Sequence, residues 1–342
     1  MIRQLIQLTR PGVFLPRFID EPWPREDVLV RPAWLSICAA DQRYFTGNRP
    51  EDVLRSKLPM ALLHEAVGEV LHDPAGHFTP GAKAALAPCA APSAESRIAA
   101  NYREGGRFYS STCDGFAQEF LSLPRGQLVP LPPAPSEEEE KIYVFAEMVS
   151  VCVHVVSRWR ALGGRPEGHA GIWGDGALGY ILALTLKSLE PGLRLTVFGR
   201  HDEKLAFFSF VGQVLNVASR RKPVAVDYAF ECVGGDGAGP ALRDIIDHIT
   251  PQGLVFLLGV SEVDPAVHTR LVLEKGLTLT GCSRSSVADF AAAVALIGNP
   301  HVQGSLRKII SEEREVRHSN DLEQAFREEL ALPFKSVLRW RV

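Results

Sequence analysis

Short apolar runs alternate with longer apolar or amphipathic stretches through the second half of the chain. The short runs predict buried strands and the longer stretches predict helices, because the two elements differ in length and period. The expected strands are 170–173, 194–198, 213–217, 226–232, 253–259 and 277–282, and the expected helices are 180–189, one beginning at 202, and 241–249. Strands that alternate with helices predict an α/β fold with a parallel, doubly wound sheet.

The first 135 residues have a different pattern. Four segments alternate or run apolar like strands, and Gly and Pro interrupt the chain between them. These segments are 27–34, 65–71, 83–87 and 116–123. Since helical periodicity is scarce here, we expect a compact, barrel-like β-rich domain with long loops.

Between these two regions, Leu131–Ser136 is an irregular link and Ser136 begins a helix whose first turn is Glu137–Glu140. Carboxylates in a first turn interact favourably with the positive end of the helix dipole. The chain after about residue 300 has mixed character again and ends in an expected strand at 336–340. We therefore predict a first domain at 1–146, a second at 147–299, and a return to the first at 300–342.

The segment AGIWGDGALG, residues 170–179, places the motif G-x-G-x-x-G between an expected strand and an expected helix. Gly174 allows a tight turn, Gly176 lets the backbone approach a pyrophosphate, and Gly179 lets helix and strand pack closely. The helix N-terminus adds free N–H groups for the phosphates. In this context the motif predicts a dinucleotide-binding crossover.

The end of the next strand indicates which dinucleotide is bound. An NAD enzyme usually has Asp or Glu there to accept hydrogen bonds from the ribose 2′-hydroxyl. This strand instead ends in Gly199 and Arg200, with Lys204 one turn further on. Gly199 leaves room and adds no negative charge, and the Arg200 guanidinium suits a phosphate, so we expect NADPH. The other expected cofactor contacts are Ala177, Leu178, Val233 and Gly259.

Composition and charge exclude several classes of protein. The chain has 342 residues, 46% of them hydrophobic and 23% charged, which is typical of a globular protein of about two domains. A formal net charge of −3 does not favour nucleic-acid binding. No apolar run approaches about 18 residues and no signal-peptide core precedes the first domain, so we expect no membrane span. Six scattered cysteines without a C-x-x-C pair fit the reducing cytoplasm.

Four polar residues interrupt apolar surroundings in the first domain: Cys38, His64, Glu65 and Glu147. Separately, a small buried thiol, a satisfied core histidine and a surface carboxylate explain each of them better than a ligand role does. Together they favour a metal, because a buried carboxylate must be paired or bind a cation. Cys, His and carboxylate all bind Zn²⁺, although the spacing is not diagnostic.

The segments LSICAAD, LHEAVGEV and AEMVSVCVH, followed by GDGALG, resemble the zinc-dependent medium-chain dehydrogenases. WLSICAADQRYFTG, GIWGDGALGY, FECVGG, LLGVSE, VLEKGLTL and SRS more closely resemble the ribulose-5-phosphate reductases of CDP-ribitol synthesis. The resemblance implies a GroES-like catalytic domain, a Rossmann domain, and NADPH-dependent reduction of D-ribulose 5-phosphate to D-ribitol 5-phosphate for teichoic acid or capsule polymers.

By this resemblance, Cys38, His64 and Glu147 are zinc ligands, and Glu65 is an exchangeable ligand or a neighbour of the ligands. Many relatives carry a second, structural zinc on four cysteines. Only Cys89 and Cys113 lie in the corresponding region, so we expect one catalytic zinc per chain and no structural zinc.

A second departure from the family is Ala40, where many relatives have Ser or Thr to pass a proton to the substrate oxygen. The expected proton routes are Tyr44, a water near Glu65, or Asp41 through solvent. A cation should recognise the substrate phosphate, with Arg43 as first choice and Arg284 as second, although a surface role explains Arg43 equally well.

Two other functions remain open from the sequence. One is a zinc polyol dehydrogenase acting on unphosphorylated sugars, and the other is a non-catalytic dinucleotide-binding protein on the same fold. The expected partners are a sugar phosphate substrate, a second copy of the chain in a homodimer, and, as a further candidate, a cytidylyltransferase; we expect neither nucleic acid nor membrane.

Overall fold

The computed structural model describes residues 1–23, 25–90, 96–219 and 224–342. The chain divides into two compact units. The first unit comprises Met1–Ser150 and Arg284–Val342, and the second comprises Val151–Ser283. The second boundary differs from the expected one after residue 299. Helix α9 (Val287–Ile297) belongs to the first unit because it packs on strand β10 (Leu128–Pro130).

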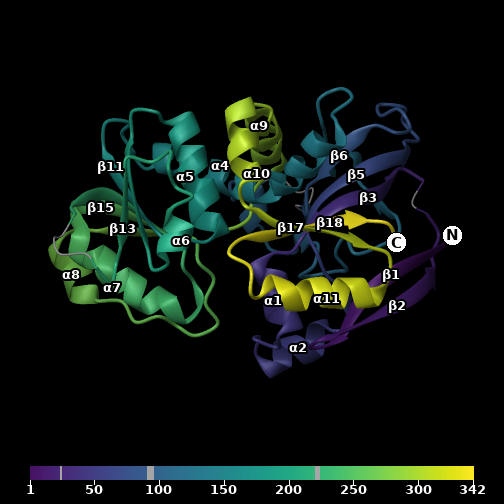
Figure 1. Ribbon diagram of the computed structural model, residues 1–342, viewed down its shortest axis with the longest axis horizontal. Coiled ribbons are helices and arrows are strands. Elements are labelled where there is room, and N and C mark those ends of the chain that lie inside the picture. The colour runs from purple at the N-terminus through teal and green to yellow at the C-terminus, as the bar shows by residue number, and fades with distance from the viewer. Residues whose placement is uncertain (24, 91–95, 220–223) are drawn as a thin grey trace. The chain divides into compact units, whose positions relative to one another are not determined.

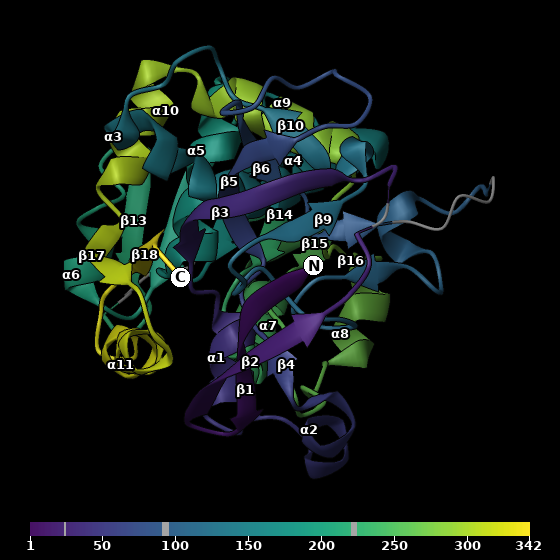
Figure 2. The same ribbon diagram turned by 90° about the vertical axis from the view of Figure 1, so that its right-hand side faces the viewer.

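The first unit is rich in strands, as the sequence predicts. Its strands are β1 (Ile2–Arg10), β2 (Val13–Asp20), β3 (Val28–Ser36), β4 (Met60–Ala61), β5 (Glu65–His72), β6 (Lys83–Leu86), β7 (Cys89–Ala90), β8 (Arg107–Phe108), β9 (Leu121–Leu123), β10, β17 (Ile310–Val316) and β18 (Lys335–Trp340). The main sheet has the order β10-β6-β5-β3-β18-β17, with β9 paired to β3. A second sheet has the order β2-β1-β4, and Figure 2 shows β1 and β2 side by side.

Helices in the first unit are short, apart from one. They are α1 (Ala39–Phe45), α2 (Glu51–Lys57), α3 (Glu137–Glu140), α4 (Ala146–Ala161), α9, α10 (Pro300–Arg307) and α11 (Ser319–Glu329), with 3-10 turns η1 (Ala100–Tyr102), η2 (Arg125–Gln127) and η3 (Lys141–Phe145). Helix α4 carries the chain into the second unit. Apolar side chains of β1, β3, β5, β6 and α11 form the core of the first unit.

Ser136 begins the helical stretch as expected. Its hydroxyl accepts a hydrogen bond from the backbone of Glu139, whose carboxylate accepts one from the backbone of Ser136. This reciprocal pair satisfies two N–H groups that a helix start leaves free.

The stretch Glu137–Ala161 differs from expectation in one respect, because it is long and apolar enough, by length and composition, to cross a membrane. Its most apolar window is 83% buried inside the protein, so core packing explains its composition.

The second unit confirms the predicted doubly wound parallel sheet. Its strands are β11 (His169–Trp173), β12 (Arg194–Gly199), β13 (Gln213–Asn216), β14 (Val226–Glu231), β15 (Ile249–Leu257) and β16 (Thr278–Gly281). Its helices are α5 (Ala177–Leu189), α6 (Asp202–Leu205), α7 (Ala238–His248) and α8 (Thr269–Glu274), with the 3-10 turn η4 (Gly235–Gly237). The strand order is β13-β12-β11-β14-β15-β16, so successive strands are added on one side of β11 and then on the other, and such sheets bind ligands at this point. Figure 1 shows β11, β13 and β15 of this sheet.

Two strand predictions were incomplete. The hairpin β1–β2 was not predicted, and the expected strand at 116–123 is limited to β9, because Phe116 and Ala117 instead bond to the backbone of Leu62 and Leu63.

Candidate functional site

Cys38, His64 and Glu65 lie together in the first unit. Cys38 caps helix α1 directly after β3, and His64 and Glu65 stand at the start of the neighbouring strand β5. One ligand atom from each residue lies within 4.8 Å of the other two. His64 is 5% exposed and Glu65 is fully buried. The antiparallel pairing of β3 and β5 thus joins residues that are 26 positions apart in sequence.

Asp41 lies beside His64 and positions its ring. The Asp41 Oδ2 atom is 3.3 Å from His64 Nδ1, which leaves Nε2 as the ring nitrogen that can bind a metal. The same carboxylate accepts hydrogen bonds from the Leu63 backbone at 3.2 Å and the Ser110 hydroxyl at 2.5 Å. Burial raises the pKa of Asp41, but His64 and these donors outweigh burial and hold it below its usual range.

The expected role of Asp41 in a proton route through solvent is therefore corrected. Its side chain is 1% exposed and is engaged by neighbouring donors, so it acts as an internal acceptor. Burial lowers the pKa of His64, whereas the Asp41 carboxylate and the Cys38 thiol raise it, and the net pKa lies well above the usual value.

Lys335, at the start of β18, is the buried cation of this cluster. Its ammonium lies 2.9 Å from Glu65 Oε2 and also donates to the carbonyl of Ile37. Burial lowers the pKa of Lys335, but the neighbouring carboxylates and Cys38 raise it further, so the lysine stays charged. Lys335 was not predicted as a site residue, although a lysine at the start of the apolar strand KSVLRW indicates a buried cation.

Glu147 lies in the first turn of α4 and is 7% exposed. It is not part of the compact group of three, yet it lies within electrostatic reach of that group. Burial raises the pKa of Glu147 to about 7; His64 lowers it and Glu65 raises it. A carboxylate held near this pKa is poised to lose its proton to a cation. Its role as a ligand stays a prediction.

Three residues around the cluster adopt the left-handed backbone region, which costs a non-glycine residue about 1–2 kcal/mol. They are Leu63 (φ 70°), Ser110 (φ 64°) and Arg284 (φ 59°). Leu63 and Ser110 both donate to Asp41. Such strain persists where surrounding structure fixes it and is common at functional sites.

Arg284 lies near the cluster of Cys38, His64 and Glu65, although it is far from these residues in the sequence. Its guanidinium is 4.9 Å from the ring centroid of Phe108, and that ring lies 5.5 Å from the ring of His64. Arg43, in the last turn of α1, is partly buried. Tyr44 is 4% exposed within the apolar core, with the Arg49 guanidinium 4.8 Å from its ring.

Cys89 and Cys113 belong to no group of three potential metal ligands within the part of the chain that the structure describes. All six cysteines are free. The expectation of no structural zinc stays a prediction, because residues 91–95 of the same region lie outside the described residues.

The second unit has a cavity of about 390 Å³ at the carboxyl ends of β11, β12 and β14. Five of the expected cofactor contacts line this cavity: Gly174, Gly176, Gly199, Arg200 and Val233. The other expected contacts do not line it; these are Ala177, Leu178, Gly179, Lys204 and Gly259. Ala177–Gly179 form the start of α5, behind the glycine turn. Asp175, His201 and Asp244 also line the cavity and were not predicted from the sequence. Of these three, Asp175 could have been found from the sequence, because it occupies a variable position inside the glycine motif.

The interpretation of Gly199 is corrected by its surroundings. A Cβ atom at Gly199 would lie 2.7 Å from both the Cβ and Oδ2 atoms of Asp175, and 2.8 Å from Leu205. The volume that a side chain at residue 199 would take is therefore filled by protein, including a carboxylate.

Glu231 organises the neighbouring loops. It is 2% exposed, and its Oε1 atom accepts hydrogen bonds from the backbones of Val233 and Gly234 at 2.8 Å. Its Oε2 atom accepts one from Gly259 at 3.0 Å. One carboxylate thus fixes the turns after β14 and β15, where Val233 lines the cavity.

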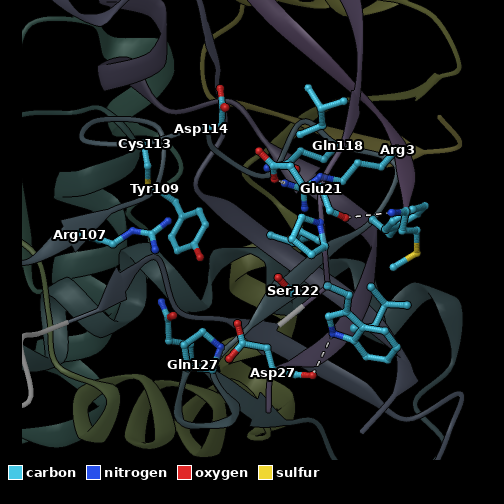
Figure 3. Close-up of a pocket in the computed structure, with 18 of the residues that line it drawn as sticks. Arg3, Glu21, Asp27, Arg107, Tyr109, Cys113, Asp114, Gln118, Ser122 and Gln127 are labelled. Atoms are coloured by element: carbon cyan, nitrogen blue, oxygen red, sulfur yellow. Dashed lines mark hydrogen bonds and ion pairs between the residues drawn. The ribbon is translucent and has the colours of Figure 1, made fainter. Parts of the chain in front are cut away.

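Another cavity, of about 370 Å³, lies in the first unit and includes none of the candidate metal ligands (Figure 3). Arg3 in its wall pairs with Glu21 at 2.9 Å, and the Arg107 guanidinium lies 5.8 Å from the Tyr109 ring centroid. Since its wall carries charges of both signs, an anionic substrate is not favoured there.

The donors at Cys38, His64 and Glu65 fit a zinc ion. A thiol, an imidazole and a carboxylate are the three ligand types that zinc takes in catalytic sites, where three protein ligands leave one position open. His64 and Glu65 are buried, and one ligand atom from each lies within 4.8 Å of the other and of the Cys38 sulfur. A cation bound among these buried donors would offset part of the cost of burying them together.

Comparison with known proteins agrees with this geometry. Residues 24–133 match the alcohol dehydrogenase GroES-like domain. The chain is 43% identical to ribulose-5-phosphate reductase 1 of Staphylococcus aureus, over 99% of both chains. It is 38% identical to the ribulose-5-phosphate reductase of Bacillus spizizenii, over the full length of both. The chain belongs to the ribulose-5-phosphate reductase family of medium-chain dehydrogenases.

A solved member of this family is TarJ of Staphylococcus aureus in complex with NADPH. Its structure superposes on this one with a TM-score of 0.88 at 40% identity, covering all of both chains. The chain is accordingly a dehydrogenase-type oxidoreductase, with the GroES-like domain in its first unit and the Rossmann sheet in its second.

Proposed function

We propose that this protein reduces D-ribulose 5-phosphate to D-ribitol 5-phosphate with NADPH. The observation that carries the proposal is full-length identity of 37–43% to four proteins named ribulose-5-phosphate reductase. The cluster at Cys38, His64 and Glu65 supports it, since reduction of a ketone needs an electrophile at the carbonyl oxygen.

One zinc ion per chain would be held by Cys38, His64 and Glu65 or Glu147. When bound, zinc polarises the ketone oxygen as a Lewis acid and NADPH supplies the hydride. Asp41 fixes the His64 ring so that Nε2 stays available, and Lys335 neutralises Glu65. Such outer partners orient ligands and tune a metal site.

NADPH would bind in the second unit, with its pyrophosphate at the glycine turn and the start of α5. Arg200 and His201 line that cavity, and Lys204 lies on the adjacent helix α6. Arg200→Ala should weaken NADPH binding by about 10-fold or more, because a charged hydrogen bond contributes about 1.5–3 kcal/mol. NADH binding should change little.

We place Arg284 ahead of Arg43 as the residue that binds the substrate phosphate. Its contact with Phe108, which itself packs beside His64, supports this order. The left-handed backbone at Arg284 further supports a role beyond solvation.

For the proton, Tyr44 and a water near Glu65 remain the candidate routes. Tyr44→Phe separates them, since general acid help contributes about 10²–10⁴-fold to rate. An unchanged kcat from pH 6 to pH 9 would favour the Glu65 route.

We propose a homodimer that works in the cytoplasm. Strand β16 is an edge of the sheet, and Leu273 of the preceding helix α8 is 79% exposed. An edge strand beside exposed apolar side chains is a template for pairing with another strand. Sedimentation of the purified protein tests this, and a mixture with a cytidylyltransferase in the same experiment tests that partner.

The deciding experiment measures NADPH oxidation with D-ribulose 5-phosphate, D-ribulose and other ketose phosphates. We expect a strong preference for D-ribulose 5-phosphate and formation of ribitol 5-phosphate. Equal rates with unphosphorylated ketoses would instead indicate a polyol dehydrogenase, and no turnover of any ketose by zinc-loaded protein would contradict the proposal.

A further inference from the structure

Asp175 reaches from the glycine turn to the end of the next strand. Its Oδ2 atom accepts hydrogen bonds from the backbone N–H groups of Arg200 at 2.6 Å and His201 at 2.8 Å. The ring nitrogen Nδ1 of His201 lies 3.0 Å from the same oxygen. The turn that carries Arg200 and His201 is therefore held by a carboxylate from the glycine motif.

This carboxylate occupies the place where an acidic side chain of strand β12 would begin. The nearest atoms to a Cβ at Gly199 would be Asp175 Cβ and Oδ2, both at 2.7 Å. Residue 199 must stay glycine because Asp175 fills that volume. Strand β12 itself ends without an acidic residue, and Asp175 from the glycine turn places a carboxylate at that position.

The Asp175 side chain is still partly accessible from the dinucleotide cavity. It is 13% exposed and lines the cavity together with Arg200 and His201. The hydrogen bonds to its carboxylate are made by Oδ2, whereas Oδ1 takes none of those found among the described residues. An ionised carboxylate has about four acceptor positions, so Oδ1 can accept a hydroxyl of the cofactor.

We propose that Asp175 is the ribose-binding acid of this dinucleotide site and the residue that determines how strongly NADH competes with NADPH. The inference rests on the proposed function in taking NADPH as the cofactor. In NADH the 2′-hydroxyl donates to the carboxylate, as to the acid of NAD enzymes. In NADPH the 2′-phosphate is repelled by that carboxylate and attracted by Arg200. The cofactor preference is then the balance between two side chains on one turn.

The substitution Asp175→Asn removes the negative charge of this side chain and keeps its shape. The amide oxygen still accepts the backbone N–H groups of Arg200 and His201, so the turn is kept. The amide N–H₂ group can donate to a 2′-phosphate, and the negative charge is gone. We expect the ratio Kd(NADH)/Kd(NADPH) to rise at least 10-fold over the unmodified protein, which corresponds to about 1.4 kcal/mol.

The measurement is titration of each cofactor by its fluorescence, with the thermal unfolding midpoint as a check on folding. Glu203→Gln, which removes an exposed carboxylate from the adjacent helix α6, is the matched control and should leave the ratio unchanged. Asp175→Ala removes both acceptor and charge, and should weaken binding of both cofactors.

A ratio in Asp175→Asn within 2-fold of the unmodified protein, or an equal loss of both cofactors, would overturn the proposal in favour of a purely structural carboxylate. Failure of the proposed function is distinguishable. If the unmodified protein prefers NADH, the cofactor assignment is wrong, whereas the change in ratio on substitution still reports on Asp175.

Discussion

At the scale of single residues, the candidate metal cluster depends on partners that neutralise buried charge. Lys335 and Asp41 are 4% and 1% exposed, and each faces a residue of the opposite charge or a titratable ring. Removing one partner of a buried pair leaves an uncompensated charge, which costs several kcal/mol. Lys335 and Asp41 therefore matter to the site although neither would touch the substrate.

Variants of Arg284 and Arg43, each measured with the phosphorylated and the unphosphorylated sugar, test which arginine binds the substrate phosphate. Arg284→Ala should raise the KM for D-ribulose 5-phosphate by about 10-fold or more, because one charged hydrogen bond contributes about 1.5–3 kcal/mol. The kcat with unphosphorylated D-ribulose should change much less. Arg43→Ala is the comparison variant, and the opposite ranking of the two variants would restore Arg43 as first choice.

Glu329 gives a prediction for the pH dependence of stability. Burial raises its pKa to about 8, with Lys335 lowering it and Glu65 raising it. An acid whose pKa is raised on folding contributes stability that is complete below its unfolded pKa, near 4.5, and is lost as pH rises through 8. Glu329→Gln in metal-free protein should therefore be more stable than the parent at pH 9, by about 1–3 kcal/mol.

Urea unfolding at pH 5 and pH 9 measures this effect. The two proteins should differ little at pH 5, where the carboxyl is already protonated. Glu104→Gln, at an exposed position, is the control. An advantage of Glu329→Gln at pH 5 that equals the one at pH 9 would rule out ionisation as its cause.

At the scale of elements, the proposed cofactor site is a cavity built from turns at the carboxyl ends of parallel strands. Asp175 fixes the turn after β12, and Glu231 fixes the turns after β14 and β15. Each carboxylate takes backbone N–H groups that the strand ladders leave free. Buried polar groups of this kind are satisfied within the protein, which holds the cavity in shape before ligand arrives.

The glycines of the motif should behave differently when replaced by alanine. A Cβ at Gly176 meets nothing within 4 Å, whereas one at Gly179 would lie 2.0 Å from the carbonyl oxygen of Gly174. Gly176→Ala should keep the unfolding temperature and weaken NADPH binding about 10-fold or more, because its methyl group obstructs only the approaching pyrophosphate. Gly179→Ala should lower both.

Calorimetry and cofactor titration on the two variants test this. A Gly176→Ala protein that binds NADPH as tightly as its parent would place the pyrophosphate elsewhere in the second unit.

At the scale of the whole molecule, the two proposed sites lie in different units of the chain. The metal candidates lie in the first unit and the dinucleotide cavity in the second. Each unit has an apolar core of its own. Ligands that bind one unit should therefore stabilise that unit selectively, by mass action on its folded state.

Metal removal tests the first unit. We expect elemental analysis to give one zinc per chain, and dialysis against a chelator to lower the unfolding temperature by several degrees, since a bound ligand stabilises the native state. Cys38→Ser should lose the metal and the stabilisation together. A chelated protein with unchanged stability and activity would contradict a zinc site.

The sequence by itself determined the fold class, the glycine motif and the candidate ligand types. These follow from local signals, because strand and helix periods are readable in short windows and G-x-G-x-x-G acts through its own backbone. The capping pair at Ser136 is equally local, since both partners lie within one turn. The resemblance to the ribulose-5-phosphate reductases added a predicted activity to these local signals.

Only the tertiary structure decided which groups from distant segments meet. Lys335 pairs with Glu65 across 270 residues, and Asp175 fills the space beside Gly199 from a separate loop. Both arise because sheet pairing and loop packing join segments that no local pattern connects, and long-range charge pairing depends on distance in space. The sequence therefore shows that β12 ends without an acidic residue, and only the fold shows that Asp175 places a carboxylate there.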